Sequence, residues 1–135
     1  MSREQVNSEI AGALGLVPSF MNNVPDERIG AEWELFKQVQ GQENHLPMKY
    51  RELIGLGIAA ASKCKYCVYF HTKFAKTFGA SDAEIEEALS FAKSNVGWSA
   101  YINGVQPEWA SFTSEIDQAC AHIGAQIAAA NNGQG

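Results

Sequence analysis

The sequence lacks a long hydrophobic run and any excess of basic residues. Its longest apolar run spans residues 53–61, whereas a transmembrane helix needs about 20 consecutive apolar residues. The formal net charge is −5, so the chain has no surplus of Lys and Arg to neutralise the phosphates of nucleic acid or of an anionic membrane. We therefore expect no nucleic acid and no membrane among its partners.

Cysteine is also scarce. The three cysteines are too few, and odd in number, for the disulfide framework of a small secreted protein. Residues 1–5 are polar and lack the apolar centre of a signal peptide, which favours a cytoplasmic protein. In that reducing compartment the close pair Cys64 and Cys67 indicates metal binding or redox chemistry. Cys120 is remote from both and is expected to be a small core residue.

Length and composition point to one folded unit. The chain has 135 residues, of which 46% are hydrophobic and 19% charged, a balance typical of globular proteins. This length suits one compact domain, and no internal repeat or linker divides it. We therefore predict a single domain over residues 1–135.

Apolar residues recur every three or four positions along most of the chain, and no stretch alternates as a half-buried strand does. We predict an all-α fold, a single-domain bundle of about six helices. The expected helices begin near residues 3, 25, 47, 64, 81 and 107.

Local features refine this prediction. Residues 53–61 are apolar on nearly every side, so the third helix should be central and buried. Gly55 and Gly57 lie within it and should let a neighbouring helix approach closely. The S-x-x-E pattern that begins at Ser81 predicts a capping box at the start of the fifth helix. Around residues 95–97 that helix should kink or restart.

The side chains that carry chemistry lie on the fourth helix. At about 100° per residue, Cys64, Cys67 and His71 project within about 60° of one another. Cysteines three residues apart on a helix have Cα atoms about 5 Å apart, within the range of a disulfide. His71 follows Cys67 by one turn, where a neutral imidazole can take the thiol proton and leave a nucleophilic thiolate. A helix start near Cys64, with Lys63 and Lys65 beside it, would lower a thiol pKa further.

Glu52 precedes Cys64 by twelve residues and lies on the preceding helix. If the two helices pack antiparallel, its carboxylate meets the face that carries the cysteines and the histidine. A carboxylate in so apolar a helix needs a partner. Hydrogen-bonded to His71, it would orient the ring and accept its charge, as the third group of a nucleophile–base–orienter arrangement does.

This set of residues resembles the alkylhydroperoxidase D-like (AhpD-like) branch of the carboxymuconolactone decarboxylase family. The resemblance rests on Arg51-Glu52-Leu53-Ile54, on the twelve-residue step from Glu52 to Cys64, on the C-x-x-C pair, and on the histidine four residues after its second cysteine. It extends over about residues 46–89.

The resemblance implies an all-α fold that assembles into homo-trimers or homo-hexamers and reduces small hydroperoxides with thiols. By position, Cys67 would be the peroxidatic cysteine and Cys64 the resolving cysteine, while Glu52 and His71 would form a proton relay. No bound cofactor is expected. An external dithiol, from a lipoyl protein or a thioredoxin-like donor protein, would restore the thiols.

The sequence departs from the family pattern at Tyr66, where the better-known relatives have histidine. Lactone decarboxylases of the family lack the cysteine pair, so its presence argues against their activity. Three alternatives remain open. They are a lyase that acts on a lactone through Glu52 and His71, a non-enzymatic redox-sensing module, and a zinc site in which Cys64, Cys67 and His71 supply three of four ligands.

Overall fold

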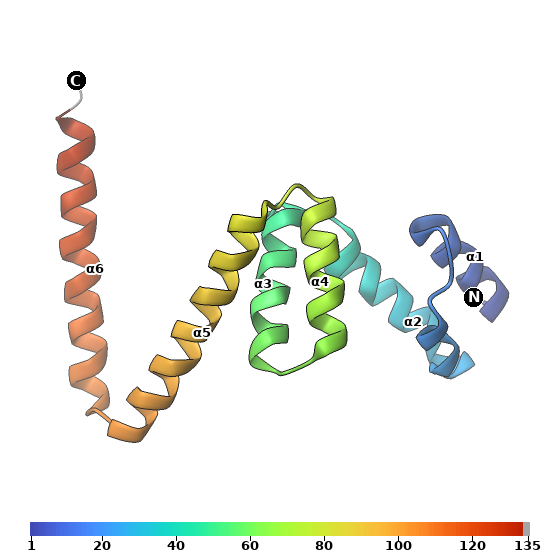
Figure 1. Cartoon of the computed structure of the whole chain (residues 1–135), viewed down its shortest axis with the longest axis horizontal. Helices are drawn as coiled ribbons and strands as arrows, with labels where there is room; N and C mark the ends of the chain where they lie inside the picture. Colours follow the sequence, from blue (N-terminus) through green and yellow to red (C-terminus); the bar gives the residue numbers. More distant parts are fainter. Residues whose placement is uncertain (134–135) are drawn as a thin grey trace. The chain divides into compact units, whose positions relative to one another are not determined.

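The computed structural model describes residues 1–133, and its regular structure there is helical throughout (Figure 1). This confirms the predicted all-α fold with six helices. Two short helical segments, η1 and η2, flank α2. The elements are α1 (Arg3–Leu14), η1 (Ser19–Asn23), α2 (Asp26–Phe36), η2 (Lys37–Gly41), α3 (Met48–Ala61), α4 (Lys65–Thr77), α5 (Asp82–Val105) and α6 (Trp109–Asn132).

The chain divides into two compact units, Met1–Leu89 and a second that starts at Ser90, with the boundary inside α5. The prediction of one domain over residues 1–135 stays a prediction. All four side chains singled out for chemistry belong to the first unit. The two units are therefore described separately.

Helices α1 and α2 form one of two apolar clusters in the first unit. Four buried side chains make up this cluster, two from each helix: Val6, Ile10, Ile29 and Trp33. The Trp33 indole N–H donates to Glu9 at 3.1 Å, and Lys37 also binds Glu9 at 2.9 Å. A capping box of Ser2 and Gln5 starts α1, because those side chains satisfy backbone N–H groups that have no partner within the helix.

Helices α3 and α4 pack side by side and hold the second cluster (Figure 1). Its buried members come from α3, α4, the connection between α4 and α5, and the start of α5: Leu56, Ala75, Ala80 and Ile85. Gly79 has a φ of 92° and Ala80 N–H donates to Ala75 C=O, the glycine-dependent ending that stops α4. The capping box at Ser81 is confirmed, since Ser81 and Glu84 exchange hydrogen bonds of 2.8 and 3.1 Å.

One prediction about α3 is wrong for the described chain. Only Glu52, Leu56 and Ala59 are buried on it, whereas Ile54 and Ile58 are 51% and 63% exposed. The reason is geometric: α4 covers one face of α3, and no other described element buries the opposite apolar face.

The second unit also corrects two predictions. Helix α5 runs without interruption through residues 95–97, because one glycine costs a helix only about 1 kcal/mol. Cys120, expected in the core, is exposed on α6. Within residues 1–133, no helix combines the length and the apolar character that crossing a membrane requires.

Candidate active site

Glu52 and His71 meet across the interface of α3 and α4. Glu52 is the one charged side chain that is buried among the described residues, and its Oε2 lies 2.7 Å from Nδ1 of His71. A buried carboxylate is costly without such a partner. If the carboxylate is ionised and the ring neutral, the ring donates through Nδ1–H and Nε2 keeps its lone pair. The predicted pairing of these two residues is confirmed.

Gly55 makes room for this pairing. A Cβ atom at Gly55 would lie 2.5 Å from both Cε1 and Nδ1 of His71 and 2.8 Å from Nε2. Real Cβ contacts essentially never come that close, so the imidazole lies directly over the backbone of α3. The close approach predicted for Gly55 is confirmed, and the approaching group is the His71 ring.

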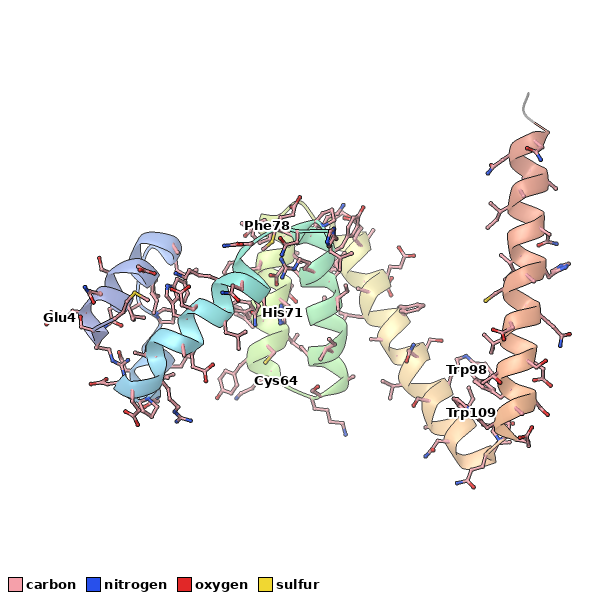
Figure 2. The ribbon with its side chains drawn as sticks, turned by 180° about the vertical axis from the view of Figure 1, so that it is seen from behind. Glu4, Cys64, His71, Phe78, Trp98 and Trp109 are labelled. Atoms are coloured by element: carbon pink, nitrogen blue, oxygen red, sulfur yellow. The ribbon has the colours of Figure 1, made fainter. Side chains whose placement is uncertain are left out.

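Cys64 lies at the start of α4, where its backbone turns into the helix (Figure 2). Its half-buried side chain caps the helix, because Sγ accepts the Cys67 N–H at 3.2 Å. Hydrogen bonds from the Cys67 thiol, from the Cys67 N–H and from the Tyr66 N–H lower the pKa of Cys64 below its ordinary value. Unpaired N–H groups at a helix start stabilise a thiolate in this way.

Cys67 lies in the first turn of α4, is exposed, and behaves in the opposite way. Its hydrogen bond to Cys64, partial loss of water and the charge of Cys64 raise the pKa of Cys67 above its ordinary value. The first proton therefore leaves Cys64, and Cys67 needs a base. Lys63 and Lys65, predicted to lower a thiol pKa, are not among the causes of either shift.

The structure thus brings the predicted residues together as two pairs. Cys64 and Cys67 are joined at the start of α4, and His71 is joined to Glu52 one turn further along. Among the hydrogen bonds of residues 1–133, none links His71 to either sulfur. In the same range, no three His, Cys, Asp or Glu side chains form a set that could hold a metal ion.

Two hollows adjoin these pairs. A cavity of about 370 Å³ has Glu52 and three aromatic rings in its wall, Phe70 and Phe74 of α4 and Phe78 just after it. A shallow depression of about 560 Å³ adjoins Cys64. We call it the Cys64 depression. It is lined by Ala60, Lys63, Cys64, Lys65, Val68, Tyr69 and Thr72.

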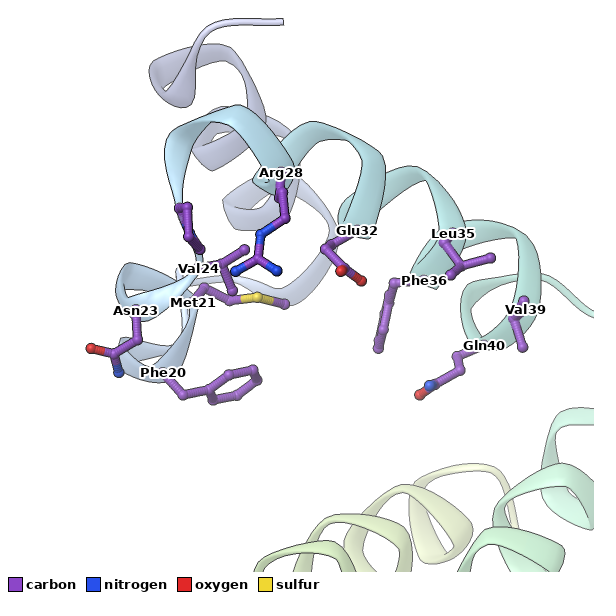
Figure 3. A pocket seen from close by; sticks show the side chains of 11 residues that line it. Phe20, Met21, Asn23, Val24, Arg28, Glu32, Leu35, Phe36, Val39 and Gln40 are labelled. Carbon is purple, nitrogen blue, oxygen red and sulfur yellow. The ribbon is translucent and has the colours of Figure 1, made fainter.

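A third hollow, of about 480 Å³, lies between η1 and α2 (Figure 3). Its lining includes Phe20, Arg28 and Glu32 and no cysteine or histidine. This hollow therefore does not adjoin the cysteine pair or the Glu52–His71 pair.

The sequence analysis did not predict that Trp33 and Phe36 of α2 help line the cavity beside Glu52, since no local spacing links α2 to α4.

Comparisons with known proteins found a family model and a solved structure that are similar to the chain. The model of the carboxymuconolactone decarboxylase family matches residues 28–107, more than half of the chain. The crystal structure of the alkylhydroperoxidase AhpD core from Rhodospirillum rubrum is similar, with a TM-score of 0.70 and 26% identity. The similarity covers 81% of this chain and 84% of that one. No curated protein matches.

Proposed function

The chain belongs to the carboxymuconolactone decarboxylase family, and we propose that it is a thiol-dependent peroxidase that reduces hydroperoxides through Cys64 and Cys67. The observation that carries this proposal is the contrast between the two sulfurs. Cys64 caps the start of α4 and has a lowered pKa, whereas Cys67 is exposed and has a raised pKa. The similar solved structure is described as an alkylhydroperoxidase, which supports the same activity.

In the first step Cys67 attacks the hydroperoxide. Nε2 of His71, with Nδ1 held by Glu52, takes the Cys67 proton, and the thiolate forms a bond to one peroxide oxygen. The O–O bond breaks, and the departing alkoxide receives the proton and leaves as an alcohol. Cys67 becomes a sulfenic acid. A relay is needed here because the pKa of Cys67 lies above its ordinary value.

In the second step the Cys64 thiolate attacks the sulfur of the Cys67 sulfenic acid. An S–S bond forms, the S–O bond breaks, and hydroxide leaves as water after it gains a proton. Two thiols have then supplied the two electrons that reduce the hydroperoxide to alcohol and water. Cys64 is suited to this role, since the hydrogen bonds that lower its pKa favour its thiolate form.

The rest of the cycle depends on partners. We propose that no cofactor is bound and that an external dithiol, from a lipoyl or thioredoxin-like donor protein, reduces the Cys64–Cys67 disulfide. We further propose that the chain works in the cytoplasm as a homo-trimer or homo-hexamer.

The test is turnover of several hydroperoxides in the presence of a dithiol, with wild type compared with Cys67→Ser and Glu52→Gln. We expect Cys67→Ser to abolish turnover. Glu52→Gln should slow it by about 10²-fold or more, because the base loses its orienting carboxylate. Wild-type rates in both variants would contradict the proposal.

One observation favours a second function, a lyase that acts on a lactone. His71 is hydrogen-bonded to Glu52 and to neither sulfur, so the pair could transfer protons without the thiols. Lyase activity on a lactone that survives replacement of both cysteines by serine would establish this alternative. Oxidation that changes assembly without turnover would instead indicate a redox-sensing module.

A further inference from the structure

The Cys64 depression combines apolar and basic side chains around a sulfur. Its floor is apolar and half-buried, from Ala60 at the end of α3 and Val68 on α4, and its rim carries Lys63 and Lys65. Cys64 lies in its wall, while Cys67 does not. A molecule in this depression therefore reaches the sulfur of Cys64 first.

The rim is positively charged in an acidic protein. Residues 53–81 contain no Asp or Glu and four lysines, although the whole chain has a net charge of −5. Of these lysines, Lys76 pairs with Asp82. Within residues 1–133, neither Lys63 nor Lys65 forms an ion pair. Lys65 Nζ lies 5.2 Å from the centroid of the Tyr66 ring, a contact that leaves its charge unneutralised. Both charges are thus available to an anionic ligand.

Lys63 occupies a backbone position that favours glycine. Its φ is 57°, in the left-handed region. Lys63 lies within the turn that is closed by the hydrogen bond from the Cys64 N–H to the Ala59 C=O. Glycine would adopt this helix-ending conformation without a steric cost. The chain instead has an ammonium group at this point of the rim.

Helical spacing places the depression on a different face of α4 from Cys67. On an ideal helix His71 projects about 40° from Cys67, whereas Val68 and Thr72 project about 100° and 140° from it. A nucleophile in the depression therefore approaches Cys64 from the side away from Cys67. That is the direction in which a thiolate displaces the far sulfur of a disulfide.

We propose that the Cys64 depression is the site of the reducing dithiol, that Lys63 and Lys65 bind a negatively charged group on it, and that it attacks Sγ of Cys64. The inference rests on the redox pair of the proposed function and adds where the dithiol binds, the charge that it carries and the sulfur that it attacks. An anionic dithiol fits because an apolar floor accepts its hydrocarbon part while the two ammonium groups face its charge.

The reaction balances as two thiol–disulfide exchanges. The first dithiol thiolate bonds to Cys64 Sγ, the Cys64–Cys67 bond breaks, and Cys67 leaves as a thiolate that takes a proton from water. The second dithiol thiolate then attacks the donor sulfur, and Cys64 leaves as the thiolate that the start of α4 stabilises. The donor ends as a disulfide and the protein as a dithiol.

The test compares two reductants that differ only in charge, dihydrolipoate and dihydrolipoamide. The full-length protein is oxidised with diamide, so that disulfide formation does not depend on peroxidase activity. The second-order rate of disulfide reduction is then measured at about 0.1 M and about 1 M salt, where screening lengths are about 10 and 3 Å. We expect the anion to react about fivefold faster at the lower salt and equally fast at the higher.

The variants locate the charge effect. Lys63→Gln with Lys65→Gln should bring the ratio of the two rates to about one, because the ammonium groups are gone. Lys76→Gln removes one charge from the same helix, about 18 Å from Cys64 along its axis, and should keep the ratio. An equal ratio in all three proteins would overturn the proposal. So would a charge preference that appears only in the peroxide step, since the depression would then bind the hydroperoxide.

The attacked sulfur is identified separately. The oxidised protein is treated with the anionic monothiol 2-mercaptoethanesulfonate, quenched with acid, and mapped by mass spectrometry. We expect the adduct on Cys64, and an adduct on Cys67 would overturn the proposed direction of attack. If diamide gives this result while hydroperoxides give no turnover, the donor site stands and the proposed peroxidase activity fails.

Discussion

The position of the His71 imidazole depends on the absence of a side chain at Gly55. Gly55 has no side chain, and the ring fills the space where a Cβ would lie. This contact fixes the distance between α3 and the ring, so that Nδ1 reaches Glu52 at 2.7 Å. Gly55 thus acts as a positioning residue for the relay, through His71.

Replacing Gly55 by alanine should separate this pair. The added methyl group would overlap the ring, push His71 from α3 and leave the buried Glu52 carboxylate unpaired. We expect the free energy of unfolding to fall by about 2 kcal/mol and turnover to approach that of Glu52→Gln. Denaturant unfolding and the peroxidase assay measure the two effects.

The matched control is Gly12→Ala on α1, where a Cβ would have nothing within 4 Å. There alanine should raise the free energy of unfolding by about 0.5–1 kcal/mol, because glycine weakens a helix interior. Opposite signs at the two glycines are the expected result. A gain in stability at Gly55 with unchanged turnover would show that the ring does not need this space.

At the scale of the element, the start of α4 decides which sulfur ionises first. The helix begins at Lys65, so Cys64 caps it and Cys67 lies inside the first turn. The backbone N–H groups converge on Cys64. The sequence predicted a helix start at residue 64 or 65 but could not choose between them, and that single residue determines which thiol becomes the cap.

Titration of the thiolate absorbance tests this arrangement. In wild type the first thiolate should form below the ordinary cysteine pKa and belong to Cys64. Cys64→Ala should lower the pKa of Cys67, because the hydrogen bond and the charge that raise it are gone. Cys67→Ala should raise the pKa of Cys64 by removing the thiol hydrogen bond.

The sign of the pH dependence follows from the same assignment. Since Cys67 holds its proton above the ordinary range, the peroxide step should accelerate as the pH rises towards that pKa. A first thiolate located on Cys67, or a pKa of Cys67 unchanged by Cys64→Ala, would contradict the role assigned to the start of α4.

Helix limits were largely predictable because their signals are local. The glycine ending of α4 and the capping box at Ser81 each involve residues close in sequence. The end of α2 was not predictable in this way. Residues after Phe36 form the wider turns of η2 before Gly41, and nothing in their spacing distinguishes those turns from an ordinary helix end.

At the scale of the whole molecule, sequence patterns predict that a side chain becomes buried but not what buries it. Ile54 and Ile58 have the pattern of a central helix and yet are exposed in the described chain. The homo-trimer or homo-hexamer implied by the family resemblance would cover such faces, and it stays a prediction. Whether another copy of the chain covers these side chains depends on the shape of its surface, and the spacing of apolar residues within one chain does not predict that shape.

The candidate site divides in the same way. Cys64, Cys67 and His71 follow from helical spacing. The meeting of Glu52 with His71 was predicted only on the condition that the two helices pack antiparallel, which spacing alone does not determine and which the family resemblance supported. The Cys64 depression was not predicted as a site. It forms where the end of α3 meets α4, a tertiary feature without a motif of its own.

The central claim is that Cys64 and Cys67 exchange electrons with a hydroperoxide, and the mass of the protein tests it most directly. The reduced chain is mixed with an equimolar hydroperoxide, alkylated and mapped by peptide. We expect the mass to fall by two hydrogen atoms and a bond to form between Cys64 and Cys67, reversed by a dithiol. Thiols that stay reduced, or a disulfide to Cys120 instead, would contradict it.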